Sequence, residues 1–518
     1  MTIPTFPGDS DQQFRFFPDE LSDSAKDAIT TYLDTAKSAG DKDILSRTSR
    51  VIGSLAVFAD GNLPPHAYDV AALMPLARQL EHPNQPLRYR AASDGLFQYF
   101  TRTDRPPTRT GGYVGTLLGD MPHLRASAGA YRERLDDVQR RIFEGDEPIS
   151  KRQWLDFTVG ADIPEIARIH DKTNVESQLI MAADAVDRIA HESDDDQELF
   201  DHIIRAESFH SVPLEVYGFH AFDMMLQSAA GKKRVLRSGN EQVLEQTTKI
   251  IERAKNIETE DILYHYFGVH PKQHAFQTAH EPLYDEPIIF SSTHLPELSP
   301  GAEQGILHAR FKTIGKYALK TLRNDHYDIE GIEDMKLPSD LFGMLAVVPD
   351  EEALGKLFAQ LIHRAMKNEA IELKTAASKE RPFFVKGSPD YVQRVFEQLP
   401  PELHRHVQVE EIKNAPADHI YQVAKFTSIL HIGNETLPVE FQFQTEADRA
   451  NARLGRPSHM SHNAGKGVGA SRIIPGTEDD LQKIYARKHK IDPNGEYVNR
   501  YSIPNGYEMR RRYLSSLR

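Results

Sequence analysis

Two strand-like stretches decide the fold: YQVAKFTSILHI at residues 421–432 and LPVEFQFQT at residues 437–445. Apolar and polar side chains alternate along the second stretch, so one face is apolar and the other is polar. The apolar positions are Val439, Phe441 and Phe443, and the polar ones are Glu440, Gln442 and Gln444. Gly433 and Asn434 lie between the stretches and fit a tight hairpin turn. We therefore predict an antiparallel hairpin with one buried face.

The polar face of this hairpin is the first candidate for a site. If the register aligns the two strands, their polar side chains share one surface. These side chains are Tyr421, Lys425, Glu440, Gln442 and Gln444. A plain solvated face of an antiparallel sheet has the same pattern, so the alternation alone does not decide between the two interpretations.

The hairpin belongs to an α+β region. Before it we expect a helix over residues 303–323, a strand over 341–349 (LFGMLAVVP) and a helix over 351–368. Residues up to about 270 read as helical, with amphipathic spacing over 175–191 and 241–257. We predict an all-helical N-terminal part followed by a mixed β-sheet domain.

The expected boundaries follow these changes of pattern. Residues 1–150 form a helical N-terminal region, and residues 151–270 form a second helical domain. Residues 271–301 are rich in Pro and His and form a connection, with a short strand at 287–291. The sheet domain covers 302–470, and a basic tail covers 471–518.

Composition limits the classes of function. The 518 residues carry 62 Lys plus Arg and 76 Asp plus Glu, a net charge of −14, so the whole chain is not a basic nucleic-acid binder. Cysteine is absent, which excludes disulfides, thiolate metal sites and a cysteine nucleophile. No long apolar run or secretory signal is visible, so we expect a soluble cytoplasmic protein without a membrane segment.

Two further features suit a nucleotide. Lys312, Lys316 and Lys320 follow one another at spacing four behind Arg310, which places a basic stripe on the expected helix. A polyphosphate would relieve the mutual repulsion of these cations, although the spacing by itself favours a plain solvated basic face. Asp340 directly precedes the 341–349 strand, where a carboxylate can bind Mg²⁺ or simply cap a turn.

The order of these segments resembles the synthetase domain of RelA/SpoT-type alarmone enzymes. That family shows R-x-K-x-x-x-S-x-x-x-K, then D-L-x-G-x-R, G-Y-Q-S-x-H, E-x-Q-x-R-T and A-E-x-G-x-x-x-H. The matching positions here are Arg310, Lys312, Lys316 and Lys320; Asp340, Leu341 and Gly343; Tyr421 and Gln422; Glu440, Gln442 and Thr445; and Ala452, Gly455 and His459. Five ordered segments spread over about 150 residues carry the resemblance.

The resemblance implies a pyrophosphokinase that moves pyrophosphate from ATP to the 3′-hydroxyl of GDP or GTP. It implies that Arg310, Lys312, Lys316 and Lys320 bind ATP phosphates, and that Asp340 and Glu440 are catalytic and hold Mg²⁺. It places Tyr421 on the guanine and adds Lys425, Gln442 and His459 to the acceptor side. A regulatory protein or an RNA remains open as a further partner.

The chain departs from the family pattern in several places, and the family's K-D-Y-I-x-x-P-K-x-N segment ahead of the tyrosine is scarcely present, with Glu410 and Ala417 where lysines would stand. Leu345 and Gln444 stand where the family has arginines, and Lys425 and Arg449 stand where it has histidines. A nucleotide-sensing or partner-binding protein on the same fold, without catalysis, is therefore the alternative.

The residues around Ile180 to Ile189 are similar to a helix of the family's metal-dependent hydrolase domain. Asp184 matches a metal ligand of that domain, and His66 could match another. A His-Asp pair is missing at the expected spacing, because His170-Asp171 lies too close to Asp184. We therefore expect this domain to be metal-free and inactive as a hydrolase.

Overall fold

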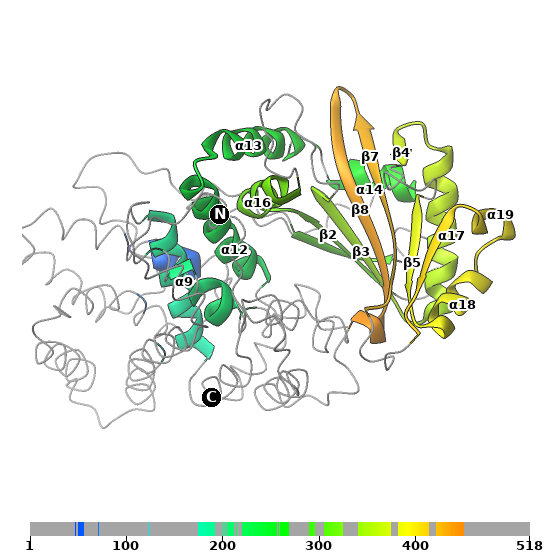
Figure 1. The fold of residues 1–518 in the computed structure, drawn as a ribbon, viewed down its shortest axis with the longest axis horizontal. Helices are drawn as coiled ribbons and strands as arrows, with labels where there is room; N and C mark the ends of the chain where they lie inside the picture. Colours follow the sequence, from blue (N-terminus) through cyan, green and yellow to red (C-terminus); the bar gives the residue numbers. More distant parts are fainter. Residues whose placement is uncertain are drawn as a thin grey trace, which may run out of the picture.

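The computed structural model describes residues 175–191, 205–211, 220–255, 259–268, 290–295, 305–324, 340–373, 382–413 and 421–449, with shorter pieces such as 50–55 elsewhere. These residues form helices and a mixed β-sheet, which confirms the predicted α+β class (Figure 1). Within these ranges no helix is long and apolar enough to cross a membrane.

The sheet is built from eight strands in the described part of the chain, in the order β1-β2-β3-β8-β7-β5-β6 with β4 beside β7. Neighbouring strands are antiparallel except for the pairs β3–β8 and β5–β6, which are parallel. Their bounds are β1 Phe290–His294, β2 Ile306–Phe311, β3 Phe342–Val348, β4 Ile371–Leu373, β5 Phe383–Gly387, β6 Val407–Glu411, β7 Val423–Ile432 and β8 Glu435–Thr445.

The predicted hairpin is present as β7 and β8, which pair antiparallel from Ala424 opposite Phe443 to Ile432 opposite Glu435. Gly433 turns the chain with φ of 58°, a left-handed conformation that glycine adopts without strain. The predicted strand and helix before it are also confirmed, as β3 and as α17 (Glu351–Lys367). Asp350 caps α17 by accepting a hydrogen bond from the Ala353 amide at 2.9 Å.

The predicted helix over 303–323 is wrong in its first half. Residues Ile306–Phe311 form strand β2, and helix α16 covers only Ile314–Asn324. The side chains of Leu307, Ala309 and Phe311 are buried, and they alternate with less buried positions at the period of a strand. Arg310 therefore lies on a strand and Lys312 in a connection, so the basic residues do not form one helical stripe.

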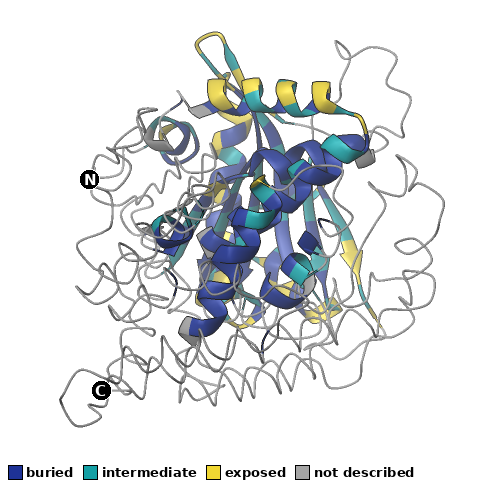
Figure 2. Ribbon diagram, turned by 90° about the vertical axis from the view of Figure 1, so that its left-hand side faces the viewer, coloured by how far each residue is buried: buried dark blue, intermediate teal, exposed yellow. Residues whose placement is uncertain are grey.

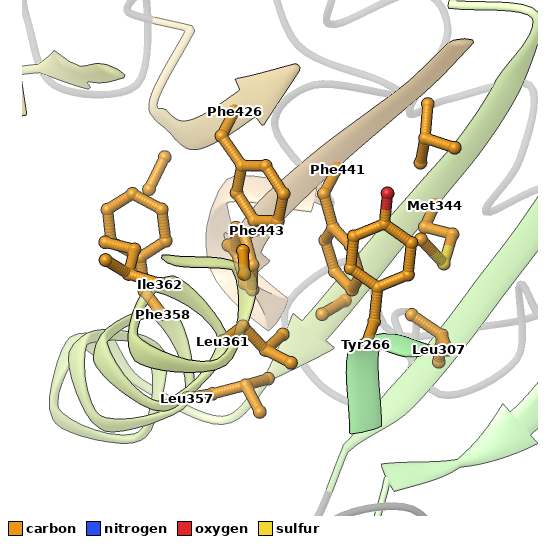
Figure 3. Close-up of a cluster of buried hydrophobic side chains, with 14 of the residues drawn as sticks. Tyr266, Leu307, Met344, Leu357, Phe358, Leu361, Ile362, Phe426, Phe441 and Phe443 are labelled. Carbon is orange, nitrogen blue, oxygen red and sulfur yellow. The ribbon is translucent and has the colours of Figure 1, made fainter. Parts of the chain in front are cut away.

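Helices α17 and α14 (Thr259–Phe267) cover one face of the sheet with an aromatic core (Figure 3). The ring of Phe358 on α17 lies 5.0 Å from that of Phe443, and Phe441 stacks on Phe443 at 4.7 Å. Tyr266 on α14 lies beside Phe441 at 5.9 Å. Helix α18 (Pro389–Glu397) and the short α19 (Pro401–His404) follow β5 and add side chains to the same core. Buried residues are concentrated in the sheet and in the helices against it (Figure 2).

Helix α14 and strand β1 both precede residue 302, where the sheet domain was expected to begin, and both pack or pair with the sheet. The Arg364 guanidinium of α17 donates to the Phe267 carbonyl at 2.7 Å, and the Tyr266 hydroxyl bonds the Ser428 hydroxyl of β7 at 2.7 Å. Strand β1, at Phe290–His294, begins three residues later than the short strand expected at 287–291, overlaps it at 290–291, and pairs with β2. A helix from the expected second helical domain therefore packs on the sheet, and a strand from the expected connection forms part of it.

The buried hydrogen bond between Tyr266 and Ser428 gives a test of this packing. Tyr266→Phe and Ser428→Ala should each lower the free energy of unfolding by about 1–2 kcal/mol, because each leaves one buried hydroxyl without its partner. The double variant should cost less than the sum of the two, since it removes both hydroxyls. Urea unfolding followed by circular dichroism measures all three variants. Strictly additive losses would contradict the bond.

A second group of helices meets the sheet domain at α16. Helix α12 (His220–Arg237) crosses α16 where Gly231 and Gly315 face each other, and the Gly315 amide donates to the Ser228 hydroxyl at 3.0 Å. Helix α13 (Glu241–Lys255) also packs against α16, and α9 (Val175–His191) packs against α12. The helix that carries Lys316 and Lys320 is therefore held by close contacts with the helices that precede the sheet.

Candidate nucleotide site on the polar sheet face

The register of the central strands aligns the predicted polar residues. Arg310 on β2 lies opposite Gly343 on β3, which lies opposite Glu440 on β8, which in turn lies opposite Thr427 on β7. The next row along the strands is formed by His308, Leu345, Gln442 and Lys425. These side chains alternate with the aromatic core residues and so lie on the opposite face of the sheet.

Four of the residues predicted for the site meet around Glu440. The Gln442 amide donates to Glu440 Oε1 at 2.5 Å, and the Lys425 ammonium lies 3.6 Å from Glu440 Oε2. The Tyr421 hydroxyl donates to Gln442 Oε1 at 3.2 Å. Tyr421 therefore shares a face with Glu440, as the sequence predicts. The structure leaves Tyr421 just outside the strand ladder, which begins at Val423.

Electrostatics ties Arg310 to this group. Burial raises the pKa of Tyr421, and the Glu440 carboxylate adds to the increase. The Arg449 and Arg310 guanidinium groups act in the opposite direction on that pKa. Arg310 also lowers the pKa of Lys312, so its charge acts on both Tyr421 and Lys312. Its side chain is exposed and runs past Gly343, where an added Cβ would lie 3.9 Å from Arg310 Cγ.

Asp340 is paired with two of the predicted lysines. Its Oδ2 accepts a hydrogen bond from Lys312 and another from Lys320 at 2.6 Å. Burial raises the pKa of Asp340, but the two ammonium groups outweigh it and hold the pKa below its ordinary value. Burial lowers the pKa of Lys312 to about 8, with Lys320 and Arg310 adding to the decrease against the effect of Asp340.

The second oxygen of Asp340 is the atom that fits a metal ion. Asp340 Oδ1 is buried and lacks a hydrogen-bond partner among the described residues. Asp340 lies three residues before Gly343, the neighbour of Glu440 across the β3–β8 pair. Mg²⁺ in nucleotide sites is typically bound by one or two carboxylates together with phosphate oxygens. Asp340 Oδ1 therefore fits as one ligand of such an ion, while the described residues form no group of three or more His, Asp or Glu side chains that would hold one by themselves.

The remaining predicted positions stand apart from these contacts. Lys316 lies one turn before Lys320 on α16, and an ion pair for it is absent within the ranges that the structure describes. His459 lies outside the described residues, as do Ala452 and Gly455. Gln444 is buried, and its side-chain amide donates to the backbone carbonyl of Gln422 at 3.2 Å, so it satisfies a backbone acceptor of the segment before β7.

The structure adds a residue that the sequence interpretation missed, Asp448. Its Oδ1 accepts from the Gln422 side chain at 2.8 Å, and its Oδ2 accepts from the Thr445 hydroxyl at 2.6 Å. The Asp448 amide in turn donates to the Thr445 hydroxyl at 3.1 Å. Thr445 and Asp448 form a capping box, which the T-x-x-D spacing in the sequence could have predicted. The long-range partner, Gln422, carried no such local signal.

The pKa of Asp448 predicts how stability varies with pH. Burial raises this pKa above the ordinary 3.8, and Glu351 adds to the increase against hydrogen bonds from Thr445 and Gln422. The folded state then binds the proton more tightly than the unfolded chain, so the contribution of Asp448 to stability falls as the pH rises through the folded pKa. Lowering the pH from about 7 to about 4 should raise the melting temperature of the wild type relative to Asp448→Asn. A constant difference between the two melting temperatures would contradict the shift.

Asp184, the candidate metal ligand of the helical part, is held by arginines. Its Oδ1 accepts from Arg47 at 2.6 Å, and Arg188 lies 3.4 Å from its Oδ2. The neighbouring Asp187 accepts from Arg50 at 2.5 Å. Guanidinium groups thus supply the positive charge beside these buried carboxylates. His66 and the pair His170-Asp171 lie outside the described residues.

The structure thus shows two groups of paired side chains. The first is Asp340 with Lys312 and Lys320, and the second is Glu440 with Tyr421, Lys425 and Gln442. The charge of Arg310 acts on the pKa of one member of each group, Lys312 and Tyr421. Comparisons of the chain with protein-family models, with curated proteins and with solved structures find no match.

Proposed function

We propose that the chain is a nucleotide pyrophosphokinase, which transfers pyrophosphate from ATP to the 3′-hydroxyl of GDP, GTP or a related acceptor. The observation that carries the proposal is that Arg310, whose charge acts on Lys312 of the first group, lies in the same row of the sheet as Glu440 of the second. Asp340 with its lysines offers charge for a polyphosphate, and Glu440 with Tyr421 offers a carboxylate beside an aromatic ring. The order of the motifs along the sequence adds support.

In the proposed reaction the acceptor hydroxyl oxygen attacks the β-phosphorus of ATP. The bond between that phosphorus and the oxygen bridging to the α-phosphorus breaks, and AMP leaves with the bond electrons. Glu440 takes the proton of the hydroxyl. The protein must mainly align the groups and offset the charge on the transferred phosphates.

The charged residues divide this work. Arg310, Lys312 and Lys320, together with Lys316, bind ATP phosphates through charge-assisted hydrogen bonds. Tyr421 stacks on the acceptor base, an interaction worth about 1–3 kcal/mol, and Gln442 orients both Tyr421 and Glu440. Asp340 and Glu440 would hold Mg²⁺, which when bound supplies further neutralisation of phosphate charge.

A nucleotide-sensing or partner-binding protein without catalysis is the second candidate. The observation that favours it is the loss of charge on this face. Leu345 and Gln444 are uncharged where the resembled family has arginines, and Gln444 is committed to the Gln422 backbone. Lys425 Nζ lies 3.6 Å from Glu440 Oε2, so the carboxylate proposed as the base already has a cation beside it.

One assay separates the two candidates. The purified chain is incubated with ATP labelled in the γ-phosphate, Mg²⁺, and GDP, GTP or tRNA in parallel reactions. A pyrophosphokinase releases AMP and produces a labelled acceptor in at least one reaction. Binding of ATP without release of AMP in any of them would favour the non-catalytic candidate.

A further inference from the structure

We propose that Asp448 is a positioning residue for the acceptor side of this site: it holds Gln422 and thereby fixes Tyr421 beside Gln442. This inference rests on the proposed function. Asp448 is 7% exposed, and its two carboxylate oxygens divide their hydrogen bonds between two segments. One oxygen accepts from Gln422, just before β7, and the other accepts from Thr445 at the end of β8.

Gln422 is restrained through both ends of its side-chain amide and through its backbone. Its Oε1 accepts from the Ser388 amide at 3.2 Å and from the Ser388 hydroxyl at 3.0 Å. Its Nε2 donates to Asp448 at 2.8 Å, and its backbone carbonyl accepts from Gln444 at 3.2 Å. The orientation of the Gln422 amide is therefore unambiguous, because the Ser388 amide can only donate.

Tyr421 depends on this arrangement because it lies outside the strand ladder. The β7 ladder begins at Val423, so Tyr421 gains no backbone pairing of that kind from β8 or β5. Its hydroxyl reaches Gln442 at 3.2 Å, a single hydrogen bond at the far end of a long side chain. The hydrogen bonds that hold the adjacent Gln422 then set the direction in which the Tyr421 ring leaves the backbone.

The donors and acceptors around Gln422 allow a swap experiment. In Asp448→Asn the single amide oxygen can accept either from Gln422 or from the Thr445 amide and hydroxyl, so one of the two segments faces a donor instead of an acceptor. Turning the Gln422 amide over instead would set a donor against the Ser388 amide. The double variant Gln422→Glu with Asp448→Asn restores every pair, because the introduced asparagine amide then donates to the introduced glutamate carboxylate. Asp390→Asn, an exposed acid on the adjacent helix α18, is the matched control.

The readouts are steady-state kinetics of AMP release and amide exchange of residues 421–428. We expect Asp448→Asn to raise KM for the acceptor about tenfold with KM for ATP unchanged, and to speed exchange of this segment. The swap should return both values, and Asp390→Asn should change neither. An equal rise in both KM values, or a swap that fails to rescue, would overturn the positioning role. If the wild type releases no AMP, the proposed function fails. Amide exchange then tests the role of Asp448 alone, and exchange unchanged in Asp448→Asn overturns it.

Discussion

Replacing Gly315 with alanine is expected to lower the free energy of unfolding by about 3 kcal/mol, the upper end for overpacking a close contact. In an exposed helix the same change would stabilise by about 1 kcal/mol. A Cβ at Gly315 would overlap the Ser228 carbonyl oxygen, which belongs to the backbone of α12 and cannot turn away. The added methyl group must therefore separate α16 from α12.

Thermal and urea unfolding of Gly315→Ala measure this loss, with Gly343→Ala as the matched control. At Gly343 an added Cβ meets nothing nearer than Arg310 Cγ at 3.9 Å, so the control should be at least as stable as the wild type and up to about 1 kcal/mol more stable. If Gly315→Ala is as stable as the control, the close crossing of α12 and α16 is refuted.

The second large effect concerns transfer. Asp340→Asn should reduce the rate of AMP release by about 10³-fold, the loss typical when one charge-stabilising group is removed from an active site. The variant loses a carboxylate that pairs with Lys312 and Lys320 and whose other oxygen would bind Mg²⁺ in the proposed function. Much of the ATP affinity should remain, because both lysines are retained.

The control for Asp340→Asn is Asp350→Asn, at the exposed N-cap of α17. Asparagine caps helices as well as aspartate does, so the control should keep both its stability and its rate. Initial rates of AMP release are compared after circular dichroism shows that both variants are folded. Full activity of folded Asp340→Asn would remove Asp340 from the mechanism.

The sequence predicted those elements whose apolar residues recur at a clear strand or helix period. Alternating positions and a Gly-Asn pair were enough for β7 and β8, and long apolar spacing was enough for α17. Strand β2 was missed because Arg310, Lys312, Lys316 and Lys320 also fit helical spacing and run directly into α16. Strands β4, β5 and β6 are short, with too few residues for alternation to stand out.

The candidate site was predictable where its residues lie on those elements. Register brings Glu440, Gln442 and Lys425 together, as the hairpin implied, and Tyr421 joins them. Asp340, Lys312 and Lys320 were also predicted as site residues from the sequence, and they do lie together. The sequence did not predict that they form ion pairs with one another. Contacts between distant segments were not predictable, such as Asp448 with Gln422 or Asp184 with Arg47, which are 137 positions apart.

The central claim is that this sheet face binds the phosphates of ATP, and Arg310 gives its most direct test. Arg310 is exposed and lacks an ion pair within the described part of the chain, so Arg310→Ala should leave the melting temperature unchanged. Arg405→Ala, at an exposed position after α19, removes the same charge elsewhere. ATP is titrated calorimetrically into the wild type and both variants in the presence of Mg²⁺. We predict that Arg310→Ala weakens ATP binding about tenfold and that Arg405→Ala does not. Equal affinity in all three proteins would contradict the account and leave Arg310 as a solvated side chain.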